Sequence, residues 1–183
     1  MNSLVYYLTG MGGRLDSGLG QALKSKGLDV TGRELVGEFR RLGFQEQIDA
    51  VTHDLNENLW SAEARVIANS FGAYLFLHSQ AQLPPYIGKV LLLSPIVGEF
   101  ANQETGMNFI PPRSERLIDI AKHGDYPAPL NCEIYVGAED WQSNPTNVEL
   151  FGSLTGLNVT VVPEAGHMLP KKYVGELLDN WLK

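Results

Sequence analysis

The chain has 183 residues, of which 44% are hydrophobic and 19% are charged, and this composition excludes a disordered or fibrous protein. Twenty-one acidic residues against fourteen basic ones give a formal net charge of -7, which opposes binding to nucleic-acid phosphates and to anionic lipid surfaces. We therefore expect one domain over residues 1–183, with no nucleic-acid and no membrane partner.

The cellular location is predicted from the cysteine count and the N-terminal segment. Cys132 is the only cysteine, so no disulfide can form within the chain. Residues 4–8 are apolar, but no basic leader precedes them and no long apolar segment follows. No apolar run approaches the roughly 20 residues that span a bilayer. We expect a cytoplasmic protein.

Apolar periodicity predicts an alternation of strands and helices along the chain. Short apolar runs bounded by turn residues predict strands at 4–8, 28–30, 66–68, 90–93, 134–136 and 159–162. Between them, helices are predicted around 15–23, 44–55, 74–77, 117–121, 148–154 and 173–182, the last after Pro170. This order predicts an α/β fold, with a mostly parallel sheet of about six strands and helices on both faces. Ligands then bind at the carboxyl ends of the strands.

The only roomy connection between these elements covers residues 96–130, and we expect it to form a small flap. Its first part, 99–108, is polar and contains a glycine, whereas Pro111 and Pro112 are suited to begin a short helix. A flap of this size favours short acyl groups or a peptide-like chain over a long lipid tail as the substrate.

Ala68-Asn69-Ser70-Phe71-Gly72 places a serine where a buried strand gives way to a buried helix. A nucleophile elbow requires this context, because the sharp turn holds the serine hydroxyl out at its tip. The small residues at positions 68 and 72 fit a tight turn. Ser70 is therefore the candidate nucleophile.

A candidate acid and a candidate base each follow a later strand. Asp140 lies in the loop after the strand at 134–136, and His167 lies in the loop after the strand at 159–162. A serine hydroxyl becomes nucleophilic when an imidazole accepts its proton, and a carboxylate orients that imidazole. Ser70, His167 and Asp140 supply these roles, although Glu139 is a neighbouring alternative to Asp140. The order serine, acid, histidine is that of the α/β-hydrolase arrangement.

The glycine-rich loop Thr9-Gly10-Met11-Gly12-Gly13 directly follows the first strand. An oxyanion hole takes one backbone donor from the residue after the nucleophile and one from a loop after an early strand, which predicts Phe71 and Met11. Gly10 and Gly12 would let the main chain approach a substrate carbonyl. Leu15 stands where a dinucleotide fingerprint needs its third glycine, and the Gly-Lys-Ser/Thr ending of a P-loop is absent, so both nucleotide motifs are disfavoured.

On these motifs the chain resembles the α/β-hydrolase superfamily, and within it the small serine hydrolases of the retinoblastoma-binding-protein-like (YdeN-like) group. The resemblance covers nearly the whole length and implies a minimal form of the fold without the two strands that open larger members. It implies hydrolysis of a small-molecule ester, thioester or amide with no metal and no organic cofactor. Two departures are Ala68 in place of the usual first glycine and Thr9 where many members have histidine.

The predicted function is therefore that of a carboxylesterase-like serine hydrolase. Trp141 beside the acid and Met168 beside the base are the residues expected to line an acyl pocket, with a core position as the alternative for each. A catalytically silent scaffold that binds a ligand or a protein is the alternative from another class, and acyl transfer is a third reading of the same residues. No histidine and carboxylate cluster suggests a metal site.

Overall fold

The computed structural model describes residues 4–183. Six strands form one sheet in the order β2-β1-β3-β4-β7-β8, and every neighbouring pair is parallel. Their bounds are β1 (Leu4–Met11), β2 (Asp29–Leu35), β3 (Arg65–Asn69), β4 (Lys89–Leu93), β7 (Asn131–Gly137) and β8 (Asn158–Val162). The prediction of a mostly parallel sheet of about six strands is confirmed.

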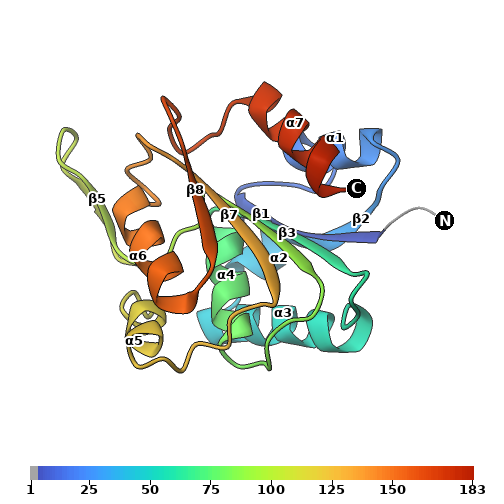
Figure 1. The fold of residues 1–183 in the computed structure, drawn as a ribbon, viewed down its shortest axis with the longest axis horizontal. Helices are drawn as coiled ribbons and strands as arrows, with labels where there is room; N and C mark the ends of the chain where they lie inside the picture. The colour runs from blue at the N-terminus through green and yellow to red at the C-terminus, as the bar shows by residue number, and fades with distance from the viewer. Residues whose placement is uncertain (1–3) are drawn as a thin grey trace.

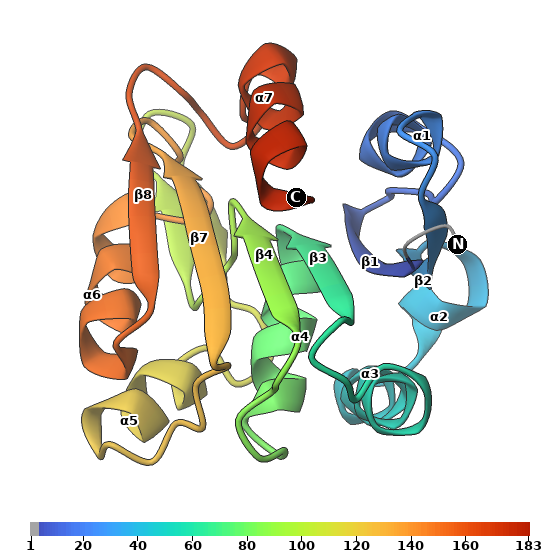
Figure 2. The ribbon, with the colours of Figure 1, turned by 45° about the vertical axis from the view of Figure 1, so that its right-hand side comes forward.

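Residues 4–183 also contain seven helices, of which the last, α7, follows the final strand. They are α1 (Gly18–Ser25), α2 (Gly37–Arg41), α3 (Phe44–Asn58), α4 (Phe71–Gln80), α5 (Arg116–Lys122), α6 (Pro145–Thr155) and α7 (Lys171–Trp181). Helices α1 and α7 cover one face of the sheet, whereas α3, α4, α5 and α6 cover the other (Figures 1 and 2). No helix within residues 4–183 combines the length and the apolar character needed to cross a bilayer.

The two faces follow from the alternation of side chains along each strand. In β1, for example, Tyr6 and Leu8 belong to the core beneath α3 and α4, whereas Val5 and Tyr7 belong to the core beneath α1 and α7. Because successive side chains point to opposite faces, strands buried on both sides are nearly continuous apolar runs. This explains why β3 and β4 could be recognised in the sequence.

Helix α4 lies at the centre of the larger core. All ten of its residues are buried, and residues 71–77, before the polar end at 78–80, are apolar on every side. Gly72 allows this helix to lie close to β1, because a Cβ there would lie 2.3 Å from the carbonyl oxygen of Thr9 and 2.5 Å from that of Leu8. The close packing fixes the start of α4 against the carboxyl end of β1.

The order of the strands reverses between β1 and β3. From β1 the chain leads outward to the edge strand β2, then crosses back to β3 and continues to the opposite edge. Such a switch point is where open α/β sheets bind ligands, because the loops that follow the two strands diverge there. Ser70 follows β3. β1 continues to Met11, so Thr9, Gly10 and Met11 are the last residues of the strand and not, as predicted, a loop after it. Residues 10–13, called the 10–13 loop below, span the end of β1 and the turn that follows it.

The structure also differs from the sequence prediction in three places. β2 extends to Leu35, beyond the predicted strand, because the polar residues Arg33 and Glu34 hide its apolar pattern in the sequence. Helix α2 was not predicted, because five residues are too few to show a helical period. Within 96–130, residues 100–102 (β5) and 107–109 (β6) form an antiparallel hairpin, where the sequence indicates only a polar segment. The hairpin projects from the body of the molecule (Figure 1).

Candidate active site

Ser70 lies at a sharp turn between β3 and α4. Its backbone has φ 52° and ψ -117°, a conformation that L-residues rarely adopt and that is found at functional turns. The Ser70 N–H donates to the Leu93 carbonyl at 3.0 Å, and the Ser70 carbonyl accepts from the Tyr74 N–H at 3.2 Å. These bonds fix the turn to β4 on one side and to the first turn of α4 on the other.

Ser70, His167 and Asp140 form a continuous chain of hydrogen bonds. The Oγ of Ser70 lies 2.8 Å from Nε2 of His167. Nδ1 of His167 lies 2.9 and 3.0 Å from the two carboxylate oxygens of Asp140. An ionised carboxylate can only accept, so the proton of a neutral imidazole is assigned to Nδ1. Nε2 is then free to accept the proton of the Ser70 hydroxyl.

The loops that carry Asp140 and His167 are joined by backbone hydrogen bonds. The Ala138 N–H donates to the Val162 carbonyl and the Glu139 N–H to the Ala165 carbonyl, both at 2.9 Å. This approach requires Gly137, since a Cβ there would lie 2.2 Å from the Ala165 carbonyl oxygen. The acid and the histidine therefore occupy adjacent positions because β7 and β8 are neighbours in the sheet.

Asp140 is the carboxylate that contacts the histidine, and Glu139 is not. The Asp140 side chain is fully buried, whereas 19% of the His167 side chain is exposed. Asp140 Oδ1 also accepts hydrogen bonds from the N–H groups of Gln142 at 3.0 Å and Ser143 at 2.9 Å. These two hydrogen bonds satisfy the buried carboxylate oxygen and offset the cost of removing it from water. Glu139 is exposed.

The 10–13 loop lies beside Ser70. A Cβ built on Gly10 would lie 3.3 Å from the Ser70 Cβ. Thr9 holds the loop in place, because its buried hydroxyl accepts from the Leu35 N–H at 3.0 Å and donates to the Gly13 carbonyl at 3.2 Å. Met11, the last residue of β1, and Gly12 are exposed. Phe71 begins α4, where the first N–H groups have no partner within the helix.

Trp141 and Met168, the residues predicted to line an acyl pocket, lie in different surroundings. The half-buried ring of Trp141 packs edge-on against Phe100 of the hairpin with ring centroids 5.6 Å apart, and Phe100 packs against Phe109 at 5.1 Å. Trp141 thus connects the loop that carries Asp140 to the hairpin. Met168 is 84% exposed beside His167, so a core position is excluded for it.

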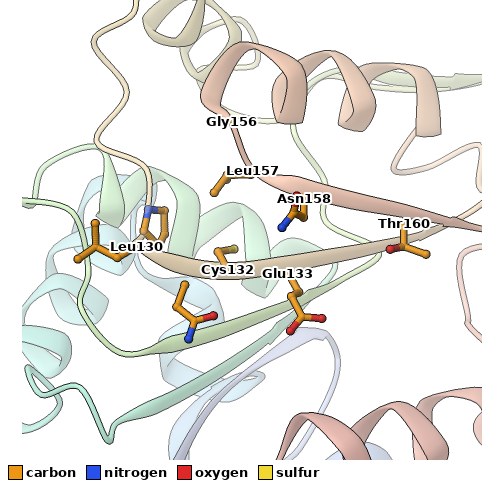
Figure 3. Close-up of a pocket in the computed structure, with 9 residues that line it drawn as sticks. Leu130, Cys132, Glu133, Gly156, Leu157, Asn158 and Thr160 are labelled. Atoms are coloured by element: carbon orange, nitrogen blue, oxygen red, sulfur yellow. The ribbon is translucent and has the colours of Figure 1, made fainter.

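A hollow on the molecule lies at the amino-terminal ends of β7 and β8, whereas the candidate site lies at their carboxyl ends (Figure 3). Its lining residues include Leu130, Cys132, Leu157, Asn158 and Thr160. Asp140 and His167 follow the other ends of the same strands, so this hollow is separate from the candidate site. Burial raises the pKa of the Cys132 thiol, which opposes formation of a thiolate nucleophile there.

Sequence reasoning missed two hydroxyl groups near the site. In the sequence, Thr9 is notable only as a departure from the usual histidine, and Ser143, which is buried and donates to the Ser94 carbonyl at 2.7 Å, is not among the predicted site residues. The position of Ser143 three residues after Asp140 is a weak local signal, since side-chain carboxylates often accept from N–H groups two or three residues on. The Ser94 contact has no signal in the sequence.

Solved structures with the same architecture cover almost the whole chain. The ydeN gene product of Bacillus subtilis matches with a TM-score of 0.69 and 12% identity over 99% of both chains. Mouse alpha/beta hydrolase domain-containing protein 10 matches with a TM-score of 0.70 and 12% identity, over 98% of this chain and 89% of that one. The chain has the α/β-hydrolase fold.

A third structure with this α/β-hydrolase fold comes from work on the carboxylesterases of the thaumarchaeon Nitrososphaera gargenis. It matches with a TM-score of 0.65 and 15% identity, over 99% of this chain and 90% of that one. By sequence, no protein-family model and no curated protein matches the chain. The likeness to the YdeN-like structures therefore concerns the fold, and the activity must be argued from the side chains.

Proposed function

We propose that the protein is a serine hydrolase that cleaves small carboxylic esters through an acyl-enzyme on Ser70. The observation that carries the proposal is the hydrogen-bonded chain from Ser70 through His167 to Asp140. This chain contains a nucleophile, a base that touches it and a carboxylate that orients the base. The carboxylesterase likeness among the structural matches agrees with this class of reaction.

In the proposed mechanism, Ser70 Oγ attacks the ester carbonyl carbon while His167 Nε2 takes the hydroxyl proton. Asp140 accepts from Nδ1–H and stabilises the imidazolium. The carbonyl oxygen becomes an oxyanion, for which the N–H groups of Met11 and Phe71 are the proposed donors. His167 then gives its proton to the leaving alcohol, and an acyl-serine remains.

Water completes the proposed cycle. His167 removes a proton from a water molecule, the hydroxide attacks the acyl carbonyl, and the collapse of the second tetrahedral intermediate returns the proton to Ser70. Gly10 and Gly12 are proposed to let the substrate approach the loop. Trp141 and Met168 are proposed to contact the acyl or alkyl group.

Labelling with a fluorophosphonate probe tests the proposal directly, because such probes phosphonylate an activated serine. We expect one adduct, located on Ser70 by peptide mass spectrometry, and no adduct with Ser70→Ala or His167→Ala. Hydrolysis of p-nitrophenyl acetate should follow the same pattern. Folded protein that forms no adduct and hydrolyses no ester would contradict the proposal and favour a ligand-binding scaffold. Acyl transfer to an added alcohol or amine, in preference to water, would identify a transferase.

A further inference from the structure

We propose that Ser143 is a positioning residue that fixes the His167–Asp140 pair relative to Ser70. The inference rests on the proposed function and adds to it a fourth side chain. Ser143 is 2% exposed, and it contacts the acid, the histidine and the segment after β4.

Ser143 makes these contacts through its backbone N–H and its hydroxyl. Its backbone N–H donates to Asp140 Oδ1 at 2.9 Å, and its Oγ–H donates to the Ser94 carbonyl at 2.7 Å. Because the hydroxyl proton is directed to Ser94, a lone pair of the same oxygen is available to a donor on another side. His167 Nδ1 lies 3.4 Å from that oxygen. The Ser143 hydroxyl is thus a second, longer acceptor for Nδ1–H beside Asp140.

Ser94 lies in the segment that holds the turn at Ser70. The preceding residue, Leu93, accepts the Ser70 N–H at 3.0 Å, and the Ile96 N–H donates to the Ser70 carbonyl at 3.3 Å. The segment 93–96 therefore holds Ser70 on both sides. Ser94 has φ 46°, which turns the chain sharply between these two bonds.

These contacts join the two halves of the site. Nucleophile and base come from loops 97 residues apart in the sequence, and the Ser143–Ser94 hydrogen bond connects the loop of the acid to the segment that holds the nucleophile. A geometric error of a fraction of an ångström at such a site lowers the rate of the chemical step. Loss of the Ser143 hydroxyl should therefore reduce turnover without reducing substrate affinity.

Ser143→Ala tests the proposal, because it removes the hydroxyl and keeps both backbone N–H donors to Asp140. With p-nitrophenyl acetate we expect kcat to fall about tenfold with little change in KM. Ser143→Thr retains a hydroxyl and should recover most of the activity. Ser79→Ala is the matched control, since the buried Ser79 hydroxyl also donates to backbone carbonyls, at 2.8 Å to Leu75 and 3.2 Å to Ile48.

A second readout does not depend on turnover. In protein labelled with ¹⁵N-histidine, the Nδ1 resonance of His167 can be assigned by its absence in His167→Ala. We expect this resonance to shift in Ser143→Ala and to stay unchanged in Ser79→Ala. If Ser143→Ala does not fold, Ser143→Cys, which substitutes a weak acceptor of similar shape, should shift the resonance in the same way.

The outcomes separate this proposal from the proposed function. Wild-type protein that shows no adduct and no ester hydrolysis would refute the hydrolase, while the ¹⁵N shift would still report on the position of His167. Wild-type kinetics and an unshifted resonance in Ser143→Ala would overturn the positioning role. An equal loss of kcat in Ser143→Ala and Ser79→Ala, with no shift in either, would also overturn it.

Discussion

The Thr9 hydroxyl accepts a hydrogen bond from the Leu35 N–H at 3.0 Å, which joins the carboxyl ends of β1 and β2. The same hydroxyl donates to the Gly13 carbonyl at 3.2 Å and closes the 10–13 loop. Thr9 is fully buried, so no water molecule replaces these bonds easily. The position at which the sequence departs from the usual histidine is therefore a fixed point of the proposed oxyanion loop.

Thr9→Val is expected to impair both folding and catalysis. The change keeps the shape of the side chain but leaves the buried Leu35 N–H without this acceptor, at a cost of about 1–3 kcal/mol in the free energy of unfolding. A looser loop should also lower kcat for p-nitrophenyl acetate. Thr9→Ser, which retains the hydroxyl, should restore kcat. Urea unfolding and steady-state kinetics measure the two effects, and full activity in Thr9→Val would contradict the role of the hydroxyl.

Ser70→Gly is expected to stabilise the protein while it abolishes activity. Ser70 has φ 52° and ψ -117°, which glycine adopts readily and serine adopts at a cost of about 1–3 kcal/mol. The free energy of unfolding in urea should therefore rise by about 1 kcal/mol. Ser70→Ala is the control, because it removes the nucleophile but keeps the Cβ. A gain of stability in Ser70→Ala as large as in Ser70→Gly would show that strain is not the cause.

Asp140→Asn is expected to reduce kcat by about 10³-fold or more, because an amide favours the wrong imidazole tautomer and cannot neutralise the imidazolium. Asp140 contacts His167 Nδ1 with both oxygens, at 2.9 and 3.0 Å. Glu139→Gln is the matched control, since it makes the same chemical change at an adjacent, exposed carboxylate. We expect it to retain wild-type kinetics. An equal loss in both variants would contradict the assignment of the acid.

The strands of this fold could be predicted from the sequence because burial on both faces makes them apolar runs. Val66–Ala68 and Val90–Leu93 are examples, and both lie within observed strands. The alternation of strands and helices then predicts a parallel sheet, and the loops after the strands contain Ser70, Asp140 and His167. The sequence could therefore indicate which residues meet, because topology brings the carboxyl ends of neighbouring strands together.

Two kinds of feature could not be predicted. The β5–β6 hairpin has three-residue strands with mostly exposed side chains, so it has no apolar alternation to indicate it. The Ser143–Ser94 contact joins residues 49 apart through a side chain and a carbonyl, and a backbone carbonyl has no residue type that a sequence could show. Positions that depend on tertiary contacts of polar groups require the structure.

Trp141→Ala is expected to raise KM more than it lowers kcat. The Trp141 ring lies 5.6 Å from that of Phe100, so its loss removes the contact between the loop that carries Asp140 and the hairpin and a proposed surface for the substrate. One aromatic contact corresponds to roughly a two- to tenfold change in KM. Steady-state kinetics with p-nitrophenyl esters of increasing chain length measure the effect. Trp60→Ala is the control, since it removes the same kind of edge-on aromatic contact, that of Trp60 with Tyr86. A KM unchanged in Trp141→Ala would remove Trp141 from the proposed substrate site.

His78 should make the stability of the protein sensitive to acid. Burial, followed by the positive charges of Arg113 and Arg116, lowers the pKa of His78 from 6.5 to about 3. The imidazole packs edge-on against Tyr74 and Phe44, and its Nε2 has no hydrogen-bond partner among residues 4–183. The folded protein therefore keeps this histidine neutral where the unfolded chain protonates it.

The sign of the effect follows from this difference in proton binding. Between pH 6.5 and 3 the unfolded chain binds more protons at His78 than the folded protein, so the free energy of unfolding falls as the pH falls. From pH 7 to pH 5 the loss is at most about 2 kcal/mol. His78→Phe keeps the aromatic packing without a titrating group, and urea unfolding at both pH values should show a smaller loss than in wild type. The exposed His53 provides the control, because His53→Gln should retain the wild-type loss, and an equal loss in all three proteins would contradict the role of His78.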